Sequence, residues 1–251
     1  MLPNNLQKYA YQLEPTLTSY IEVTTTVCEE LSFYESKLGG QPYWVGDKPY
    51  PYLDRAPAQL IAQINFSQLA EKGLTLTNFP TQGILQFFAP SGDDMVGLRF
   101  GKEHSQIKVV YHENIQPNVY SDNEIEEVNL DCEGLPFDEP LKLNFSLGEE
   151  YLGFGDQMAQ NRFNLDLYNQ MTDEEQQQYW NIVDNAGSKI GGYAYFTQDD
   201  PRKDKNLILL LQIDTDDNLM WGDSGIANWF ITEQDLINKN FDNVFFSWDC
   251  C

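Results

Sequence analysis

Basic residues are scarce in this chain. It has 15 lysines and arginines against 39 aspartates and glutamates, a formal net charge of −24. The phosphates of nucleic acids and the surfaces of anionic membranes are themselves negative, so we expect neither among its partners. Such a charge keeps copies of a protein apart in solution, and it also favours the capture of a basic partner protein.

Long apolar runs are absent as well. No stretch approaches the roughly 18 apolar residues that a membrane span needs, and residues 1–8 lack both the basic start and the apolar centre of a signal peptide. We therefore expect a cytoplasmic protein with reduced thiols. The four cysteines, Cys28, Cys132, Cys250 and Cys251, do not follow the spacing of a metal site.

Histidine and the common catalytic motifs are also poorly represented. The two histidines, His104 and His112, have no nucleophile motif beside them, so a Ser-His-Asp type of catalysis is not indicated. Neither type of glycine-rich loop that binds phosphates or dinucleotides is present. The sequence predicts no cofactor and favours a non-enzymatic protein, while leaving an activity open.

What the chain does contain is an internal repeat. The segment 36–40, Ser-Lys-Leu-Gly-Gly, returns as 188–192, Ser-Lys-Ile-Gly-Gly. An aromatic pair, an apolar run containing Gln, a Gly-Ile with two aromatics and a closing β-type run then follow in each copy. They lie at 43–44, 60–64, 83–88 and 109–111, and again at 195–196, 209–213, 225–230 and 244–246. Five matched blocks in one order predict two copies of one unit folded together.

The repeat also predicts the fold class and the domain organisation. We expect an α+β, β-rich fold in which the duplication gives two related, mostly antiparallel sheets with a few peripheral helices. The repeat units span about 30–113 and 188–250, and 114–187 connects them. A unit of that size alone would leave its apolar strands poorly covered, so we expect a single domain over 1–251.

The connection holds the clearest helix, at about 173–185. Thr172 followed by Glu175 is a capping box, in which each residue satisfies a backbone N–H of the other. Tyr179, Trp180 and Val183 give this helix an apolar side. We expect it to pack on a sheet and to bury Trp180.

Two glutamines interrupt apolar strands at matching positions of the repeat. Gln63 lies within 60–64 and Gln212 within 207–213. A buried amide without partners is costly. We therefore expect each glutamine to hydrogen-bond the backbone of a neighbouring loop.

Several blocks carry a resemblance to a known family. They are 36–42, 50–51, 60–64, 189–193, 199–202, 211–214, 221–225 and 242–244, together with Cys250. In combination they resemble the YwqG-like family of bacterial proteins, from about residue 30 to the end. The resemblance implies a fold and a domain identity, a soluble protein and a loose association with secreted-toxin systems, but no catalytic residues.

Acidic residues after one apolar strand offer a candidate metal site. Asp214 and Asp216 alternate in a segment rich in oxygen ligands, which suit a hard cation such as calcium. A calcium-binding helix-loop-helix would have Gly and Glu where this chain has Leu219 and Gly225. We therefore predict no metal site, and keep Asp214 and Asp216 as the candidates should one exist. A metal-dependent hydrolase using the acidic residues near 214–223 is the alternative function.

The function that these observations favour is a non-enzymatic binding module with an acidic surface. Its candidate binding residues are Trp44, Tyr50, Arg202, Trp221 and Asp223. Aromatic side chains anchor many interfaces, and an acidic surface selects basic partners. An immunity-like protein that neutralises a basic toxin is one version, suggested by the family resemblance. We further expect Asp223 to pair with Arg202 or with Lys189, whereas the oligomeric state is left open.

Overall fold

The computed structural model describes most of the chain. The described residues are 2–28, 30–45, 49–53, 56–91, 107–117, 132–163, 168–203 and 206–250. His104 and Cys251 lie outside them.

Within the described residues, ten strands form one antiparallel sheet. They are β1 (Thr18–Val27), β2 (Lys37–Leu38), β5 (Gln59–Asn65), β6 (Ile84–Ala89), β7 (Lys108–His112), β8 (Leu141–Glu150), β9 (Lys189–Gly191), β10 (Ile208–Asp214), β11 (Ile226–Ile231) and β12 (Phe245–Asp249). Two further strands, β3 (Tyr52–Leu53) and β4 (Ala56–Pro57), pair with each other. The order across the large sheet is β12-β11-β10-β9-β1-β8-β2-β5-β6-β7.

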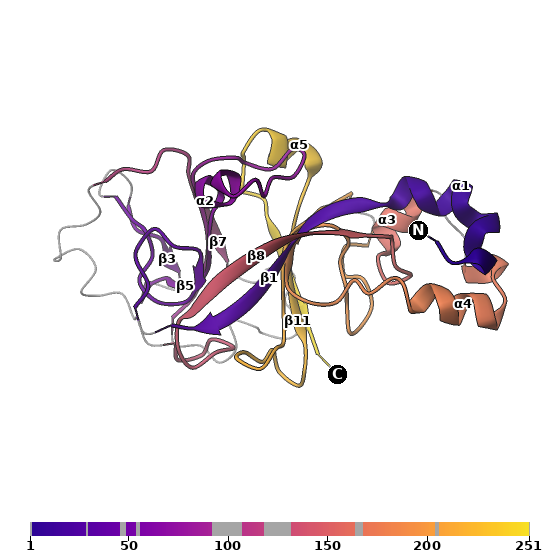
Figure 1. Ribbon diagram of the computed structural model, residues 1–251. Helices are drawn as coiled ribbons and strands as arrows, with labels where there is room; N and C mark the ends of the chain where they lie inside the picture. Colours follow the sequence, from indigo (N-terminus) through magenta and orange to yellow (C-terminus); the bar gives the residue numbers. More distant parts are fainter. Residues whose placement is uncertain are drawn as a thin grey trace.

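The prediction of two sheets is wrong, because the two long strands join the halves into one. β1 and β8 pair with each other over ten residues and form the centre of the sheet, where they appear as two long crossing ribbons in Figure 1. β9 of the second repeat pairs with β1, and β2 of the first repeat pairs with β8. Each repeat therefore adds its strands to the long strand that precedes the other repeat. The β-rich class with few helices is confirmed.

The α-helices are short. They are α1 (Ala10–Leu13), α2 (Phe66–Glu71), α3 (Gln157–Phe163), α4 (Asp173–Trp180) and α5 (Glu233–Ile237), with 3₁₀ turns at Asn4–Tyr9, Glu14–Thr16 and Tyr168–Gln170. Figure 1 shows α1, α3 and α4 gathered at one end of the molecule, whereas α2 and α5 lie near its middle. None of the described helices has the length and apolar character needed to span a bilayer.

The main hydrophobic core lies where the sheet curls onto itself. Phe87 of β6 packs against Trp229 of β11, with ring centroids 5.3 Å apart. Both side chains are buried, and Leu69 of α2 and Leu236 of α5 belong to the same cluster. The two arms of the sheet therefore face one another across a shared core, as the matched apolar blocks of the repeat predict.

A second core holds the N-terminal segment against α4. Leu6 and Leu13 are fully buried there beside Tyr179 and Val183. We name this cluster the N-terminal lobe, defined by residues 2–16 and 171–183. Its apolar contacts explain why short helices with little stability of their own are formed here.

The predicted helix in the connection is confirmed, with two differences. The capping box is present, because Thr172 and Glu175 each accept a hydrogen bond from the other's backbone N–H. The helix ends at Trp180 rather than near residue 185. The expected burial of Trp180 is wrong: it is 46% exposed, and its neighbour Tyr179 is the side chain that fills the lobe.

The two glutamines behave as predicted. Gln63 accepts a hydrogen bond from the backbone N–H of Tyr43 and donates to the carbonyls of Phe33 and Glu35. Gln212 makes the equivalent set of contacts with Tyr195, Asn185 and Gly187. Each side chain fastens two loops to the centre of a strand, at matching places in the repeat.

Candidate functional site

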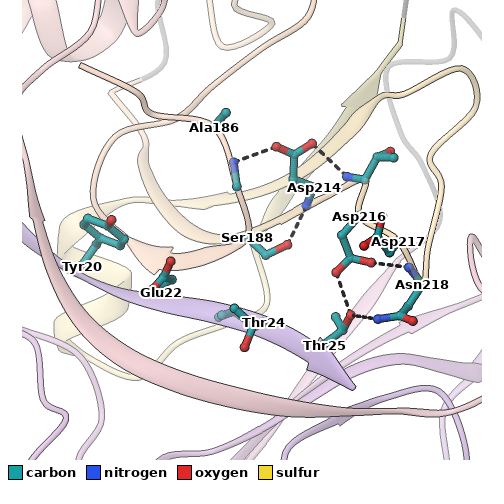
Figure 2. A pocket seen from close by; sticks show the side chains of 13 residues that line it. Tyr20, Glu22, Thr24, Thr25, Ala186, Ser188, Asp214, Asp216, Asp217 and Asn218 are labelled. Atoms are coloured by element: carbon teal, nitrogen blue, oxygen red, sulfur yellow. Dashed lines mark hydrogen bonds between the residues drawn. The ribbon is translucent and has the colours of Figure 1, made fainter. Parts of the chain in front are cut away.

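A pocket of about 320 Å³ lies in the second half of the sheet. Three segments form its walls: 20 and 22–25 of β1, the loop 186–188 before β9, and 214–218 at the end of β10. Figure 2 shows Glu22 and Thr24 of β1 facing the segment that carries Asp214 and Asp216. We name it the acidic pocket, because its charged lining residues are Glu22, Asp214, Asp216 and Asp217.

Asp214 is held in place by backbone groups. Its carboxylate accepts hydrogen bonds from the N–H of Gly187 at 2.7 Å and of Thr215 at 2.8 Å. Burial raises the pKa of Asp214 more than these hydrogen bonds lower it. The backbone N–H of Asp214 in turn donates to the hydroxyl of Ser188, so hydrogen bonds hold both the side chain and the backbone of Asp214 at the base of the pocket.

Asp216 organises the opposite wall. One carboxylate oxygen accepts hydrogen bonds from the backbone N–H groups of Asn218 and Leu219, and the other accepts from the hydroxyl of Thr25 at 2.7 Å. The side chain of Asn218 also donates to that hydroxyl (Figure 2). These bonds fix the turn after β10 against β1.

The remaining lining residues leave charge and an aromatic ring at the mouth. Glu22 and Asp217 are exposed, and Tyr20 is half-buried. Burial and the nearby carboxylates raise the pKa of the Tyr20 hydroxyl, so it stays neutral at physiological pH. The described lining includes no lysine or arginine. The cation nearby is Lys189, which lies behind Tyr20 and is paired with Glu150.

The first half of the sheet has an equivalent place. Lys37 of β2 pairs with Lys142 of β8, and Lys189 of β9 pairs with Glu22 of β1. Lys37 and Lys189 hold the same position in the repeat, so Lys142 is the counterpart of Glu22. By the same register Ser36 corresponds to Ser188, and Leu143 corresponds to Val23. Ser36 and Leu143 line a second pocket of about 220 Å³.

The second pocket carries balanced charge. Its charged lining residues are Glu35, Glu71, Lys72 and Lys142, and Lys142 forms an ion pair with Glu35 at 3.4 Å. We name it the balanced pocket. The two pockets thus share positions of the sheet but differ in charge. The helix α2 and its end complete one, which has two charges of each sign, and the turn after β10 completes the other, which has four carboxylates. The acidic lining is therefore not a requirement of the fold.

The structure places Arg202 in the core. Its guanidinium contacts the carboxylates of Asp156 at 2.5 Å and Asp200 at 2.7 Å, and all three side chains are buried. The carboxylate of Asp156 also accepts a hydrogen bond from the backbone N–H of Ala159, in the first turn of α3. The predicted pairing with Asp223 is not formed, because Asp156 and Asp200 already occupy the guanidinium.

Lys189 has a different partner from the predicted one as well. Its ammonium contacts the carboxylate of Glu150 at 2.7 Å, within the interior. Asn185 and the backbone N–H of Tyr193 donate to the same carboxylate. Asp223 lies on an exposed turn, so its expected pairing with Lys189 is wrong too.

The aromatic candidates do not line the acidic pocket. Trp44 is buried in the first half of the sheet, where its ring centroid lies 5.1 Å from that of the partly buried Tyr50. The hydroxyl of Tyr50 donates to the carbonyl of Ala58. Trp221 is fully buried in the main core beside Trp229. Of the predicted binding residues, the structure therefore brings Trp44 and Tyr50 into contact, and Trp221 and Asp223 share one turn, whereas Arg202 is apart from both pairs.

The sequence analysis missed the half of the pocket that β1 provides. Tyr20, Glu22 and Thr25 lie almost 200 positions before Asp214 and Asp216, and only the pairing of β1 with β9 brings them close. The alternation of polar residues along β1 was a usable indication, because alternate side chains of a strand share one face. This alternation indicates which face of β1 is exposed to solvent, but not that the segment 214–218 lies opposite that face.

The structure tests the candidate metal ligands only in part. Among the described residues, no group of three or more His, Cys, Asp or Glu side chains is arranged to hold a metal ion. The carboxylates of Asp214 and Asp216 are each engaged by backbone N–H groups.

Comparisons with known proteins give a family and no activity. No curated protein matches the chain. A family profile described as "Domain of unknown function (DUF1963)" matches residues 36–250. The match covers both repeats, β8 and α4, and it begins after β1. Because it covers most of the sequence, the chain belongs to the DUF1963 family.

Proposed function

We propose that this protein is a binding module that holds a lysine or arginine side chain of a basic partner protein in the acidic pocket. The observation that carries the proposal is the contrast between the two pockets. Four carboxylates line the acidic pocket, whereas the equivalent hollow has balanced charge. A cation that enters the acidic pocket supplies the missing positive charge.

The geometry of the pocket favours such a ligand. The hydrogen bonds of Asp214 and Asp216 fix two carboxylates before anything binds, and a preorganised site loses less entropy on binding. Tyr20 adds an aromatic ring at the mouth, over which Lys189 already lies at 5.2 Å, so a ligand cation would meet its edge or its other face. The net charge of −24 draws basic partners from a distance.

Two finer statements belong with this proposal. The matched hydrogen bonds of Gln63 and Gln212 support an origin of the sheet by duplication within a single domain. The resemblance to the YwqG-like family supports a bacterial protein, and a basic toxin neutralised by an immunity-like protein is a partner of the required chemistry.

The experiment is a titration with peptides of defined charge. We would measure the binding of a Lys-rich and an Arg-rich peptide by calorimetry, with Glu-rich peptides of the same length as negative controls. The test variant is Glu22→Gln with Asp217→Asn, which removes two charges from the acidic pocket. The matched control is Glu71→Gln with Glu139→Gln, which removes two exposed charges elsewhere.

The two variants separate a site from a general attraction. We expect the test variant to bind a basic peptide about tenfold more weakly, which is about 1.4 kcal/mol, and the control variant to bind as the parent does. An equal loss in both variants would show a diffuse electrostatic attraction without a site. No binding of either basic peptide would overturn the proposal.

The metal-dependent hydrolase stays a prediction with its own test. A bound cation stabilises the native state, so calcium, magnesium or manganese would raise the melting temperature. Asp217→Asn is the suitable variant, because Asp216 also holds a turn and its replacement would lower stability without any metal. A melting temperature that none of the three metals changes would count against the hydrolase.

A further inference from the structure

Two buried lysines occupy equivalent positions in the two halves of the sheet. Lys37 in β2 and Lys189 in β9 are each 1% exposed. Each lysine follows a serine whose hydroxyl accepts a hydrogen bond from a backbone N–H of the adjacent strand. Ser36 accepts from Asn65, and Ser188 accepts from Asp214. The backbone surroundings of the two amines are therefore closely alike.

The partners of the two amines differ. Lys189 contacts the carboxylate of Glu150 at 2.7 Å. Lys37 donates to the carbonyl of Ser32 at 2.8 Å, and within the described part of the chain it forms no ion pair within 4.0 Å. An ammonium group has three N–H donors, and a buried charge without a counter-ion is costly.

The charged groups near Lys37 do not compensate for its burial. Glu35, which precedes β2, favours the ammonium form, but its carboxylate already pairs with Lys142 of β8. Lys142 stands directly opposite Lys37 in the sheet and has the same charge. Gln63 of β5, on the other side, is neutral. Burial therefore lowers the pKa of Lys37 to about 8, with Glu35 opposing the shift only in part.

The repeat identifies the carboxylate that would complete the first half. Lys142 and Glu22 are equivalent through their pairing with Lys37 and Lys189. Eight residues beyond Lys142 lies Glu150, and eight residues beyond Glu22 lies Glu30. Glu30 follows the end of β1 and is exposed, whereas Glu150 is buried and forms an ion pair with Lys189.

We propose that Lys37 and Glu30 form a proton-operated latch. When Lys37 is protonated, the Glu30 carboxylate moves in and forms the pair that Glu150 and Lys189 form in the second half. When Lys37 is neutral, Glu30 is released. The structure has Glu30 exposed, away from this pairing. The latch holds the Glu30 side chain against Lys37 at neutral pH and releases it in mildly alkaline conditions.

The coupling follows from the cost of the buried ammonium. A neutral amine needs no counter-ion, so the released form is favoured above the pKa of Lys37. Below it, the released form buries an unpaired charge, and the docked form is favoured by whatever free energy the pairing supplies. By linkage, docking must raise the observed titration midpoint of Lys37 above its value in the released form.

The test is a titration of Lys37 by NMR in protein labelled with ¹³C at the lysine ε-carbons. Lys37→Met assigns the signal. Glu30→Gln removes the proposed partner, and Glu133→Gln removes another exposed carboxylate as the matched control. We expect Lys37 in Glu30→Gln to titrate near pH 8, and in the parent and the control about one pH unit higher, which is tenfold in the protonation constant.

The backbone amide of Glu30 supplies an independent readout. We expect its chemical shift to change with the same midpoint as Lys37 in the parent, and to lose this dependence in Lys37→Met. Equal Lys37 midpoints in the parent and in Glu30→Gln would overturn the latch. A Lys37 midpoint near 10.5 in Glu30→Gln would overturn it as well, because the amine would then not be sufficiently desolvated.

Discussion

Arg202 and Lys189 are two of only 15 basic residues, and both are buried against carboxylates. The cation of Arg202 joins Asp156 at the start of α3 to Asp200 in the loop between β9 and β10, and it lies over the ring of Phe230 at 4.7 Å. Such a side chain holds segments together and cannot reach a partner protein.

Removing the Arg202 cation should therefore affect folding. We expect Arg202→Met to lower the free energy of unfolding by about 3–5 kcal/mol, because it leaves two buried carboxylates without a counter-ion. Asp223→Asn, on an exposed turn, should change it by less than about 0.5 kcal/mol. Urea denaturation of both variants measures the difference. Similar small effects in the two would show that the guanidinium is not needed for stability.

Asp214 gives the proposed binding a pH dependence. Burial raises its pKa above 3.8, so the acidic pocket begins to lose charge at a higher pH than an ordinary aspartate would allow. Affinity for a basic peptide should fall as the pH drops through this raised pKa. The same shift makes the folded state take up a proton more readily than the unfolded state, so Asp214 itself favours folding on acidification.

Calorimetric titrations between pH 7 and pH 4 check this dependence, with circular dichroism confirming that the protein stays folded. The Asp214→Asn variant should bind more weakly and show a flatter profile. An affinity that does not change with pH in the parent protein would exclude Asp214 from the binding site.

At the scale of helices and strands, the features that sequence reasoning predicted correctly depend on local chemistry. A polar amide inside an apolar strand must find partners, so the roles of Gln63 and Gln212 could be predicted. The capping box of α4 depends on two residues three positions apart. The pairing of β1 with β9 could not be predicted, because antiparallel pairing of distant strands leaves no local pattern.

The same limit explains the errors in the candidate site. Trp44 and Trp221 were candidates because aromatic side chains suit interfaces, but the same side chains suit a core, and composition does not separate the two uses. Asp214 and Asp216 could be identified because they alternate within one short segment of the sequence. The opposite wall, with Glu22 and Thr25, depends on a contact between distant segments.

The cap of α4 can be tested directly. Thr172→Ala removes the side chain that accepts the N–H of Glu175, so we expect a loss of about 1 kcal/mol in the free energy of unfolding. Thr77→Ala, at an exposed position outside the helices, is the matched control. Chemical denaturation compares the two. A loss of similar size in the control would assign the effect to the substitution in general rather than to the cap.

At the scale of the whole molecule, the question is whether the sheet and the N-terminal lobe unfold together. Leu6 is fully buried in the lobe, whereas Tyr11 is 74% exposed. We expect Leu6→Ala to cost about 2–5 kcal/mol and Tyr11→Ala to have little effect. If the chain is one cooperative domain, Leu6→Ala should lower the denaturation midpoint of the sheet as well.

Tryptophan fluorescence can report on the sheet alone. Trp180 lies at the end of α4, and the other four of the five tryptophans lie in or beside the large sheet. In a Trp180→Phe background, the fluorescence transition should shift with Leu6→Ala and not with Tyr11→Ala. An unchanged transition in both would mean that the lobe unfolds separately.

The pairing of each long strand with the other half of the sheet has a consequence for cutting the polypeptide chain in two. β1 belongs to the N-terminal piece but pairs with β9, and β8 belongs to the C-terminal piece but pairs with β2. A single break in the chain between β7 and β8 would thus give two fragments, and each fragment would pair with a strand of the other. We expect the two fragments, expressed together, to copurify as one folded complex, and either fragment expressed alone to be insoluble. Protease nicking in that interval would likewise leave the assembled protein intact.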